Sequence, residues 1–350
     1  MKKTLFVLIS VAMMGYSSCN KENLESSLPF GLPGTQIFDM AIDNNNMLYF
    51  VTSEIDKSEP YSLLSSYIPH KFYLSRKSEK TGKVEILDNR YQPFGKLCFD
   101  KNNHLLTHDN KAIYRIEGSI RHKLFELPDE SHSHTYLSFI VVDDNNNIWA
   151  GGSQAGLYKI DDTRLNVTHY HVDNSELPTN NLKNIYIDKN NDIWILTEGR
   201  DEKQGILRVS NNKWVVYNNP DSYITSLVTD KNGYLWIGTG WDNENQNLFR
   251  FDGTEWETVI PRNDKNEMVK GFVARLQSDG RKLYVVITQV KNMIDYFSYS
   301  HVLLTFDGEN WDKIHVFPEN DFMGDLIVDN YRQVVWFWTL NKGKIFKIPI

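Results

Sequence analysis

The chain has 350 residues, of which 24% are charged, and its formal net charge is −7 at pH 7. This mildly acidic balance of mixed signs argues against nucleic acid as a partner, because phosphate binding requires clustered lysine and arginine. The length suffices for one large domain or two small ones, and two cysteines cannot build a disulfide framework.

The N-terminus carries the pattern of a secretory signal peptide. Two lysines precede an apolar run from Leu5 to Met14, and small residues follow it. The run is shorter than a bilayer-spanning segment. We expect residues 1–18 to be removed, which takes the net charge from −7 to −9 because Lys2 and Lys3 are lost.

The next residues predict a lipid anchor. Ser17-Ser18-Cys19-Asn20 is similar to a bacterial lipobox, with Tyr16 where an aliphatic residue is usual. The similarity implies acylation of Cys19, and each buried methylene contributes ~0.8 kcal/mol to membrane binding. We therefore expect an exported protein held at the outer membrane by lipid alone, on its periplasmic or cell-surface side. Residues 19–34 are expected to form a lipid-anchored polar tether.

A repeat dominates the rest of the chain. An aspartate, a turn rich in Asn or Gly and an aliphatic–aromatic pair recur with anchors at positions 43, 100, 143, 188, 230, 278 and 329. A period of about 40–45 residues with four strands per unit is the signature of a β-propeller. We expect residues 35–350 to form an all-β fold, a single β-propeller of about seven four-stranded blades.

One unit illustrates how the strands follow from the residues. An apolar strand at 223–228 leads into a tight turn from Asp230 to Gly233, where Asp and Asn bond their own backbone and Gly accepts positive φ. Further strands are predicted at 235–237, 248–251 and 256–260, with Asp252-Gly253 as the hairpin turn before the last one.

These residues resemble the two-component regulator propeller repeat. The best match runs from Leu177 to Leu182 into Ile193–Ile195, and Ala155–Ile160 matches the start of a third strand. The resemblance is strong in blades three to five, fair in one and two, and weak in six and seven. Such propellers often form the periplasmic sensor of hybrid histidine kinases. We find no transmembrane helix or kinase up to Ile350, so the sensor role does not carry over directly.

The resemblance implies where a site would lie. The first strand of each blade lines a central channel, and the loops that enter it share one face with the loops between strands two and three. Four of the latter are long, at about 52–70, 197–205, 238–247 and 288–301. Insertions gathered on one face usually mark the binding face.

The last unit lacks a fourth strand, and an unpaired edge is a liability. We consider the segment Ser27–Leu32 its candidate donor.

Candidate ligand-binding residues come from this loop-rich face. Eight of the nine tryptophans occupy repeat positions and are expected to pack between blades, whereas Trp241 lies off the register in a loop. Aromatic side chains with an arginine and scattered carboxylates suit a sugar or a polar small molecule. The predicted set comprises Tyr61, Tyr67, His134, Arg200, Trp241, Asp242, Tyr296 and Tyr299. Residues at the channel mouth that could add to it are Phe94, Tyr136, Tyr223 and Phe322.

Catalytic and metal-binding motifs are not found. No nucleophile elbow, phosphate-binding glycine loop or zinc-protease helix occurs in the sequence. His132 and His134 share one side of an extended segment, but no third ligand is identifiable, so we expect no metal and no cofactor. Cys98 lies in an apolar run and is predicted to be a buried, inert thiol. Acids on the loop-rich face are Glu54, Asp56, Glu198, Asp201, Asp242 and Asp295.

Three functions fit this pattern. The first is a non-catalytic outer-membrane lipoprotein that binds a glycan or other polar ligand on its loop-rich face. The second is a polysaccharide lyase or glycoside hydrolase that uses carboxylates or histidines from different blades. The third is an accessory or assembly partner of a membrane transport or secretion complex, which implies a membrane-protein partner.

Overall fold

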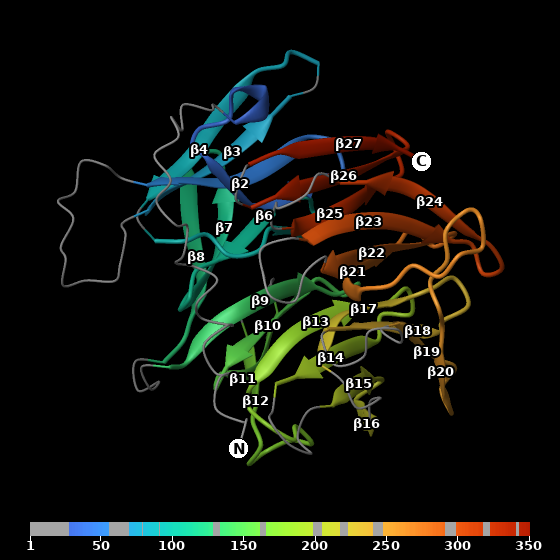
Figure 1. Cartoon of the computed structure of the whole chain (residues 1–350). Helices are drawn as coiled ribbons and strands as arrows, with labels where there is room; N and C mark the ends of the chain where they lie inside the picture. Colours follow the sequence, from blue (N-terminus) through green and yellow to red (C-terminus); the bar gives the residue numbers. More distant parts are fainter. Residues whose placement is uncertain are drawn as a thin grey trace, which may run out of the picture.

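The computed structural model is a ring of antiparallel sheets that follow one another in chain order (Figure 1). It describes residues 28–55, 70–78, 80–90, 92–128, 134–161, 166–198, 205–217, 223–240, 248–290, 299–317, 323–340 and 343–350. Within these residues there are seven sheets, six with four strands and the last with three. The predicted all-β propeller of seven blades is confirmed.

Each blade is a meander in which neighbouring strands along the chain pair with each other. Blades one and two contain β1 (Gln36–Ile42), β2 (Leu48–Ile55), β3 (His70–Lys77), β4 (Val84–Arg90), β5 (Cys98–Phe99), β6 (Leu105–His108), β7 (Ala112–Glu117) and β8 (Ile120–Glu126). Blades three and four contain β9 (Tyr136–Val142), β10 (Asn147–Ser153), β11 (Gly156–Asp161), β12 (Val167–Tyr170), β13 (Leu182–Ile187), β14 (Ile193–Thr197), β15 (Ile206–Ser210) and β16 (Lys213–Tyr217).

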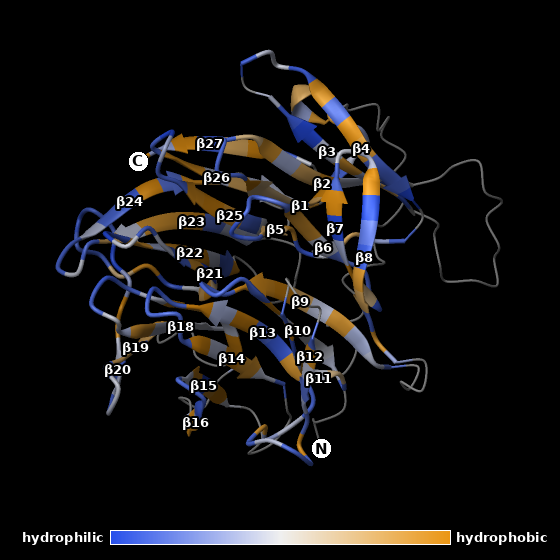
Figure 2. Ribbon diagram, turned by 180° about the vertical axis from the view of Figure 1, so that it is seen from behind, coloured by the Kyte–Doolittle hydropathy of each residue, from blue (hydrophilic) through white to orange (hydrophobic). Residues whose placement is uncertain are grey.

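The remaining blades follow the same order. They contain β17 (Ile224–Thr229), β18 (Leu235–Thr239), β19 (Leu248–Phe251), β20 (Trp256–Thr258), β21 (Phe272–Ser278), β22 (Leu283–Val290), β23 (Tyr299–Phe306), β24 (Trp311–Val316), β25 (Met323–Asp329), β26 (Val334–Thr339) and β27 (Ile345–Pro349). The first blade contacts the last through β1 and β25, which closes the ring. Hydrophobic residues follow the strands, while most turns are hydrophilic (Figure 2).

The repeat aspartate ties the turn between strands one and two to the second strand. In blade four, Asp188 Oδ1 accepts the backbone N–H groups of Asn190 at 2.9 Å and Asp192 at 3.0 Å, and Oδ2 accepts the indole N–H of Trp194 at 3.0 Å. The same indole bond joins Trp149 to Asp143, Trp236 to Asp230 and Trp336 to Asp329. The aspartate and the tryptophan therefore recur together, because the carboxylate accepts a hydrogen bond from the buried indole N–H.

Blade six shifts this anchor by one residue. The repeat spacing predicts the sixth anchor at Ser278. The carboxylate that caps the turn instead belongs to Asp279, whose Oδ1 accepts the N–H groups of Arg281 and Lys282 at 2.7 Å each. The Tyr284 hydroxyl takes the place of the indole and donates to Asp279 Oδ2 at 3.4 Å.

Asparagines in the same turns connect successive blades. Asn103, Asn146 and Asn191 adopt positive φ of 67°, 63° and 63°, a conformation that asparagine tolerates well. Their side-chain oxygens accept backbone N–H groups from the preceding blade, at 2.9 Å from Asn44, 2.8 Å from Lys101 and 2.7 Å from Asp144. One residue type thus shapes the turn and also holds two blades together.

The inner strands carry β-bulges near the channel. The register shifts across Lys183 in β13, across Thr225 in β17 and across Ala274 in β21. Side chains from the preceding blade bond the carbonyl groups beside these irregularities: Lys183 Nζ donates to Ile224 O at 2.7 Å and Thr225 Oγ1 to Val273 O at 2.5 Å. The bulges therefore expose backbone groups that the neighbouring blade satisfies.

The start of the described chain covers the last blade without extending its sheet. Pro29–Gly31 forms a short 3-10 turn, η1, and not a strand, so the prediction that Ser27–Leu32 donates the missing strand is wrong for its described part. Leu28 and Leu32 are buried against Trp336 and Trp338 of β26. Hydrophobic burial rather than backbone pairing holds this segment, because the fixed φ of Pro29 and its missing N–H favour a turn.

Candidate functional site: the channel mouth

The channel mouth lies on the face where the inner strands begin. The connections between second and third strands also end there, and the four long ones fall in blades one, four, five and six as predicted. The turns that contain the repeat aspartates lie on the opposite face. Side chains near the start of the inner strands divide the mouth into two chemically different halves.

In one half of the mouth, charged side chains from different blades form ion pairs with one another. Lys96 precedes β5, and its Nζ lies 3.1 Å from Asp39 Oδ1 of β1 and 2.9 Å from Asp325 Oδ2 of β25. Arg275 of β21 lies 3.4 Å from Asp325 through Nε and donates to Gly324 O at 3.1 Å through Nη2. Lys96 therefore reaches from blade two across blade one to blade seven.

These contacts determine the protonation of the group. Burial alone would lower the pKa of Lys96, but the carboxylates of Asp325 and Asp39 outweigh it and raise that pKa. Burial raises the pKa of Asp39, although Lys96 and the N–H of Leu97, 2.7 Å from Asp39 Oδ2, oppose it. The Asp325 carboxyl keeps a lowered pKa despite burial because Lys96 and Arg275 stabilise its charge. Each charged group here already has a partner.

In the other half, formed by blades three to five, several residues are exposed to solvent. Tyr136, which starts β9, is 40% exposed, and Tyr223, which precedes β17, is 45% exposed. Ser138, Asn184 and Glu198 are also exposed. Aromatic surface beside hydroxyl, amide and carboxylate groups is suited to a polar ligand with an apolar face.

Lys183 is the only charged residue on the inner strand β13. Its Nζ lies 3.2 Å from the ring centroid of Tyr223 and donates to Ile224 O. Burial lowers the pKa of Lys183 to about 7; Glu198 raises that pKa and Arg275 lowers it further. Burial also raises the pKa of Tyr223, and the Glu198 charge adds to this effect.

Most of the ligand residues predicted from the sequence lie outside the described part of the chain. These are Tyr61, Tyr67, Arg200, Trp241, Asp242 and Tyr296. The predicted lipidation residue, Cys19, also lies outside it. His134 is exposed in a turn two residues before β9, on the expected face. Tyr299 is the first residue of β23 and is buried, so its ring packs in the blade, 5.5 Å from that of His301.

The other residues named from the sequence differ in their exposure to solvent. Tyr136 and Tyr223 are at the mouth and exposed, whereas Phe94 is buried beneath the Arg90 guanidinium, whose centre lies 3.9 Å from the Phe94 ring centroid. Glu54 accepts the Tyr73 hydroxyl. Cys98, predicted to be buried, is partly exposed; its burial still raises the pKa of the thiol, which lowers its reactivity.

The cluster of charges around Lys96 was not predicted, although the sequence contains a signal for it. The residues four positions before the repeat aspartates include Asp39, Lys96, Asn184, Arg275 and Asp325. The shift of the sixth anchor from Ser278 to Asp279 is needed to bring Arg275 into this series. Polar residues recurring within an otherwise apolar strand mark the channel side of that strand.

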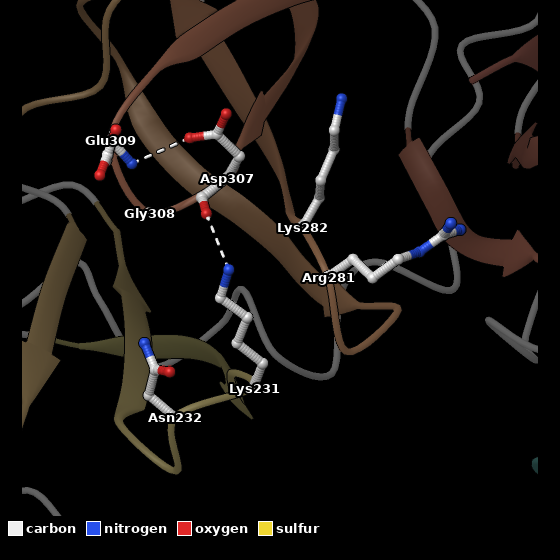
Figure 3. Close-up of a pocket in the computed structure, with 7 residues that line it drawn as sticks. All are labelled: Lys231, Asn232, Arg281, Lys282, Asp307, Gly308 and Glu309. Carbon is white, nitrogen blue, oxygen red and sulfur yellow. Dashed lines mark hydrogen bonds between the residues drawn. The ribbon is translucent and has the colours of Figure 1, made fainter.

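A cavity of about 470 Å³ lies on the face opposite the channel mouth, between blades five and six (Figure 3). Three of its lining residues are basic (Lys231, Arg281 and Lys282) and two are acidic (Asp307 and Glu309). Asp307 Oδ1 accepts the N–H groups of Glu309 and Asn310 at 2.9 and 2.8 Å, so this carboxylate serves the hairpin turn. We regard the cavity as a junction between turns.

The described residues contain no group of three or more His, Cys, Asp or Glu side chains placed to hold a metal ion. Their helical content includes no segment of the length and hydropathy that crossing a membrane requires.

Comparisons with known proteins agree with this architecture. The family model described as "Two component regulator propeller" matches residues 219–241, the unit around Asp230. No curated protein gives a significant match. Virginiamycin B lyase from Staphylococcus aureus is similar in structure, with 14% identity, a TM-score of 0.63, and 90% of this chain and 95% of that chain covered.

A protein of different description has the same fold. YCF48 from Cyanidioschyzon merolae aligns with 10% identity and a TM-score of 0.59, covering 91% of this chain and 97% of its own. Identities this low show a shared fold and do not transfer a ligand or a reaction. The chain is thus a seven-bladed β-propeller in which residues 219–241 match the two-component regulator propeller repeat.

Proposed function

We propose that this propeller is a non-catalytic binding protein that captures a glycan or a similar polar ligand at the half of its channel mouth formed by blades three to five. It is exported and held at the outer membrane through lipid on Cys19. The exposed pair Tyr136 and Tyr223, on either side of blade four, carries the proposal. Aromatic rings stack on the apolar faces of sugars, while neighbouring polar groups bond the hydroxyls.

The two halves of the mouth support this location. Around Lys96, the charges are paired with each other, so a ligand there would have to break existing ion pairs. Around Tyr223, an amide and a carboxylate are exposed to solvent, on Asn184 and Glu198; Asn184 Oδ1 accepts the N–H of the next residue, Ile185, at 2.8 Å, and no charged group has to be displaced from it. A ligand gains most where polar groups do not first have to leave protein partners.

Affinity electrophoresis of the mature protein in gels that contain different polysaccharides tests the proposal. We expect retardation by at least one polysaccharide, and its loss in Tyr136→Ala and Tyr223→Ala. Tyr331→Ala is the matched control, because Tyr331 is 74% exposed but lies in a turn on the opposite face. Equal retardation of all three variants and the wild type, or no retardation by any polysaccharide, would refute a glycan site at the mouth.

A polysaccharide lyase is the alternative that one observation favours. A lysine whose pKa is lowered to about 7, as for Lys183, can accept a proton at neutral pH. Incubation with uronate polymers, followed by ultraviolet detection of unsaturated products, distinguishes the two. Product formation that Lys183→Met abolishes would replace the binding proposal by the enzymatic one.

A further inference from the structure

The two lysines at the channel mouth have different surroundings. Lys96 has carboxylate oxygens of Asp39 and Asp325 within 3.1 Å. For Lys183, the described residues place no carboxylate oxygen within 4.0 Å of Nζ, whose one hydrogen-bond acceptor among them is the carbonyl of Ile224. An ammonium group has three donors, so Lys183 retains capacity for a ligand.

Among the residues that the structure describes, the groups around Lys183 do not supply the missing charge. Tyr223 presents its ring, and the side chains of Thr225 and Ser226 on the neighbouring inner strand are neutral. Glu198 lies beyond ion-pair distance and is exposed, and Arg275 adds a second positive charge. Half-burial of an unpaired cation is costly, and a nearby anion offsets this cost.

Resting on the proposed function, we propose that the ligand carries a carboxylate, as an acidic sugar does, and that Lys183 binds this carboxylate while Tyr223 contacts the sugar ring. The ligand carboxylate would give Lys183 the negative partner that Asp39 and Asp325 give Lys96. Asn184, the next residue on β13, is also exposed. Arg275 strengthens the attraction from the side of blade six through its long-range charge.

Direct titration of Lys183 tests this inference without knowledge of the natural glycan. The protein is produced with lysine that is ¹³C-labelled at Cε, which leaves every ammonium group unmodified, and the signal lost in Lys183→Met assigns the residue by NMR. Glucuronate and glucose serve as probes at equal ionic strength, balanced with chloride, because they differ in the carboxylate. We expect glucuronate to raise the pKa of Lys183 from about 7, and glucose to leave it unchanged.

Binding provides the second readout. Glucuronate affinity should fall about tenfold between pH 6 and pH 8 as free Lys183 loses its proton, since affinity follows the binding-competent fraction. Lys183→Met should lower the affinity for glucuronate about tenfold or more without changing that for glucose. Lys183→Arg should keep glucuronate binding and remove its pH dependence, because arginine stays charged.

The outcomes separate this inference from the proposed function. If glucuronate and glucose leave the same Lys183 pKa, or if Lys183→Met retains a preference for glucuronate, the carboxylate contact is refuted. The gel assay with Tyr136→Ala and Tyr223→Ala scores glycan binding independently. Retardation by a neutral polysaccharide together with an unshifted Lys183 would therefore refute the carboxylate contact alone.

Discussion

Replacing the repeat aspartate of blade four should destabilise the fold through the bonds that its carboxylate makes. In Asp188→Ala, three bonds to a buried carboxylate are lost, from Asn190, Asp192 and the Trp194 indole. Water can replace the one to exposed Asn190, but Asp192 and Trp194 are buried. Hydrogen bonds to charged groups contribute about 1.5–3 kcal/mol each, so we expect a loss of about 3–5 kcal/mol.

A double-mutant cycle with Trp194→Phe isolates the indole bond. Phenylalanine removes the N–H donor but keeps an aromatic ring, and the cost of its smaller volume cancels in the cycle. We expect a coupling energy of about 1.5–3 kcal/mol, because the double variant removes both the indole donor and the carboxylate acceptor of this one bond, while the loss of the Asp192 bond is common to both Asp188→Ala variants and cancels. Urea unfolding followed by fluorescence and circular dichroism measures it, provided that both transitions coincide.

Two controls make this prediction specific. Asp173→Ala removes a carboxylate whose side chain is 84% exposed, and it should change the free energy of unfolding by less than about 0.5 kcal/mol. Asp188→Asn keeps the size but loses acceptor capacity, so it should fall between wild type and Asp188→Ala. Additive effects of Asp188→Ala and Trp194→Phe, with coupling below about 0.5 kcal/mol, would refute the account of the repeat.

Three more outcomes follow from the channel and the blades. Lys96→Met should cost about 1–3 kcal/mol, a figure discounted because 47% of the lysine side chain is exposed. It should further raise the pKa of Asp39, so thermal melts should show the variant gaining stability relative to wild type as the pH falls from 7 to 5; an unchanged difference contradicts this. Gly152→Ala should lower the melting temperature because its Cβ would collide with the Tyr136 carbonyl, whereas Gly205→Ala, with neighbours at 3.5 Å or more, should not. In a Cys19→Ser background, Cys98 should react with a thiol reagent only after unfolding, and rapid labelling of the native protein would contradict the raised pKa of its thiol.

The fold could be predicted from the sequence because its chemistry is local. Asp188 and Trp194 are six residues apart and bond each other, and the asparagine at 191 shapes the turn between them. Such short-range patterns repeat visibly in the printed chain. The anchor of the sixth blade was misplaced by one residue because Ser278 and Asp279 are adjacent polar residues, and only the hydrogen bonds of Asp279 identify the capping carboxylate.

The site was less predictable, since its partners are distant in sequence. Lys96 and Asp325 are 229 positions apart, and their contact depends on how seven blades close into a ring. The role of Lys183 follows from the absence, within the described part of the chain, of a carboxylate oxygen less than 4.0 Å from its Nζ, which a sequence cannot display. Tyr136 and Tyr223 were identified as mouth residues because their place before the inner strand is fixed by the repeat.

The Lys96 bridge has a consequence for how the protein folds. Blades that touch only their neighbours form a nearly linear array, whose units can open one at a time. Lys96 of the second blade can pair with Asp39 of the first early, but it cannot form its ion pair with Asp325 of the seventh until almost the whole chain has been placed. We expect this contact to form late in folding, when the ring closes. It should make the opening of the seam between blades one and seven more cooperative than that of any other junction.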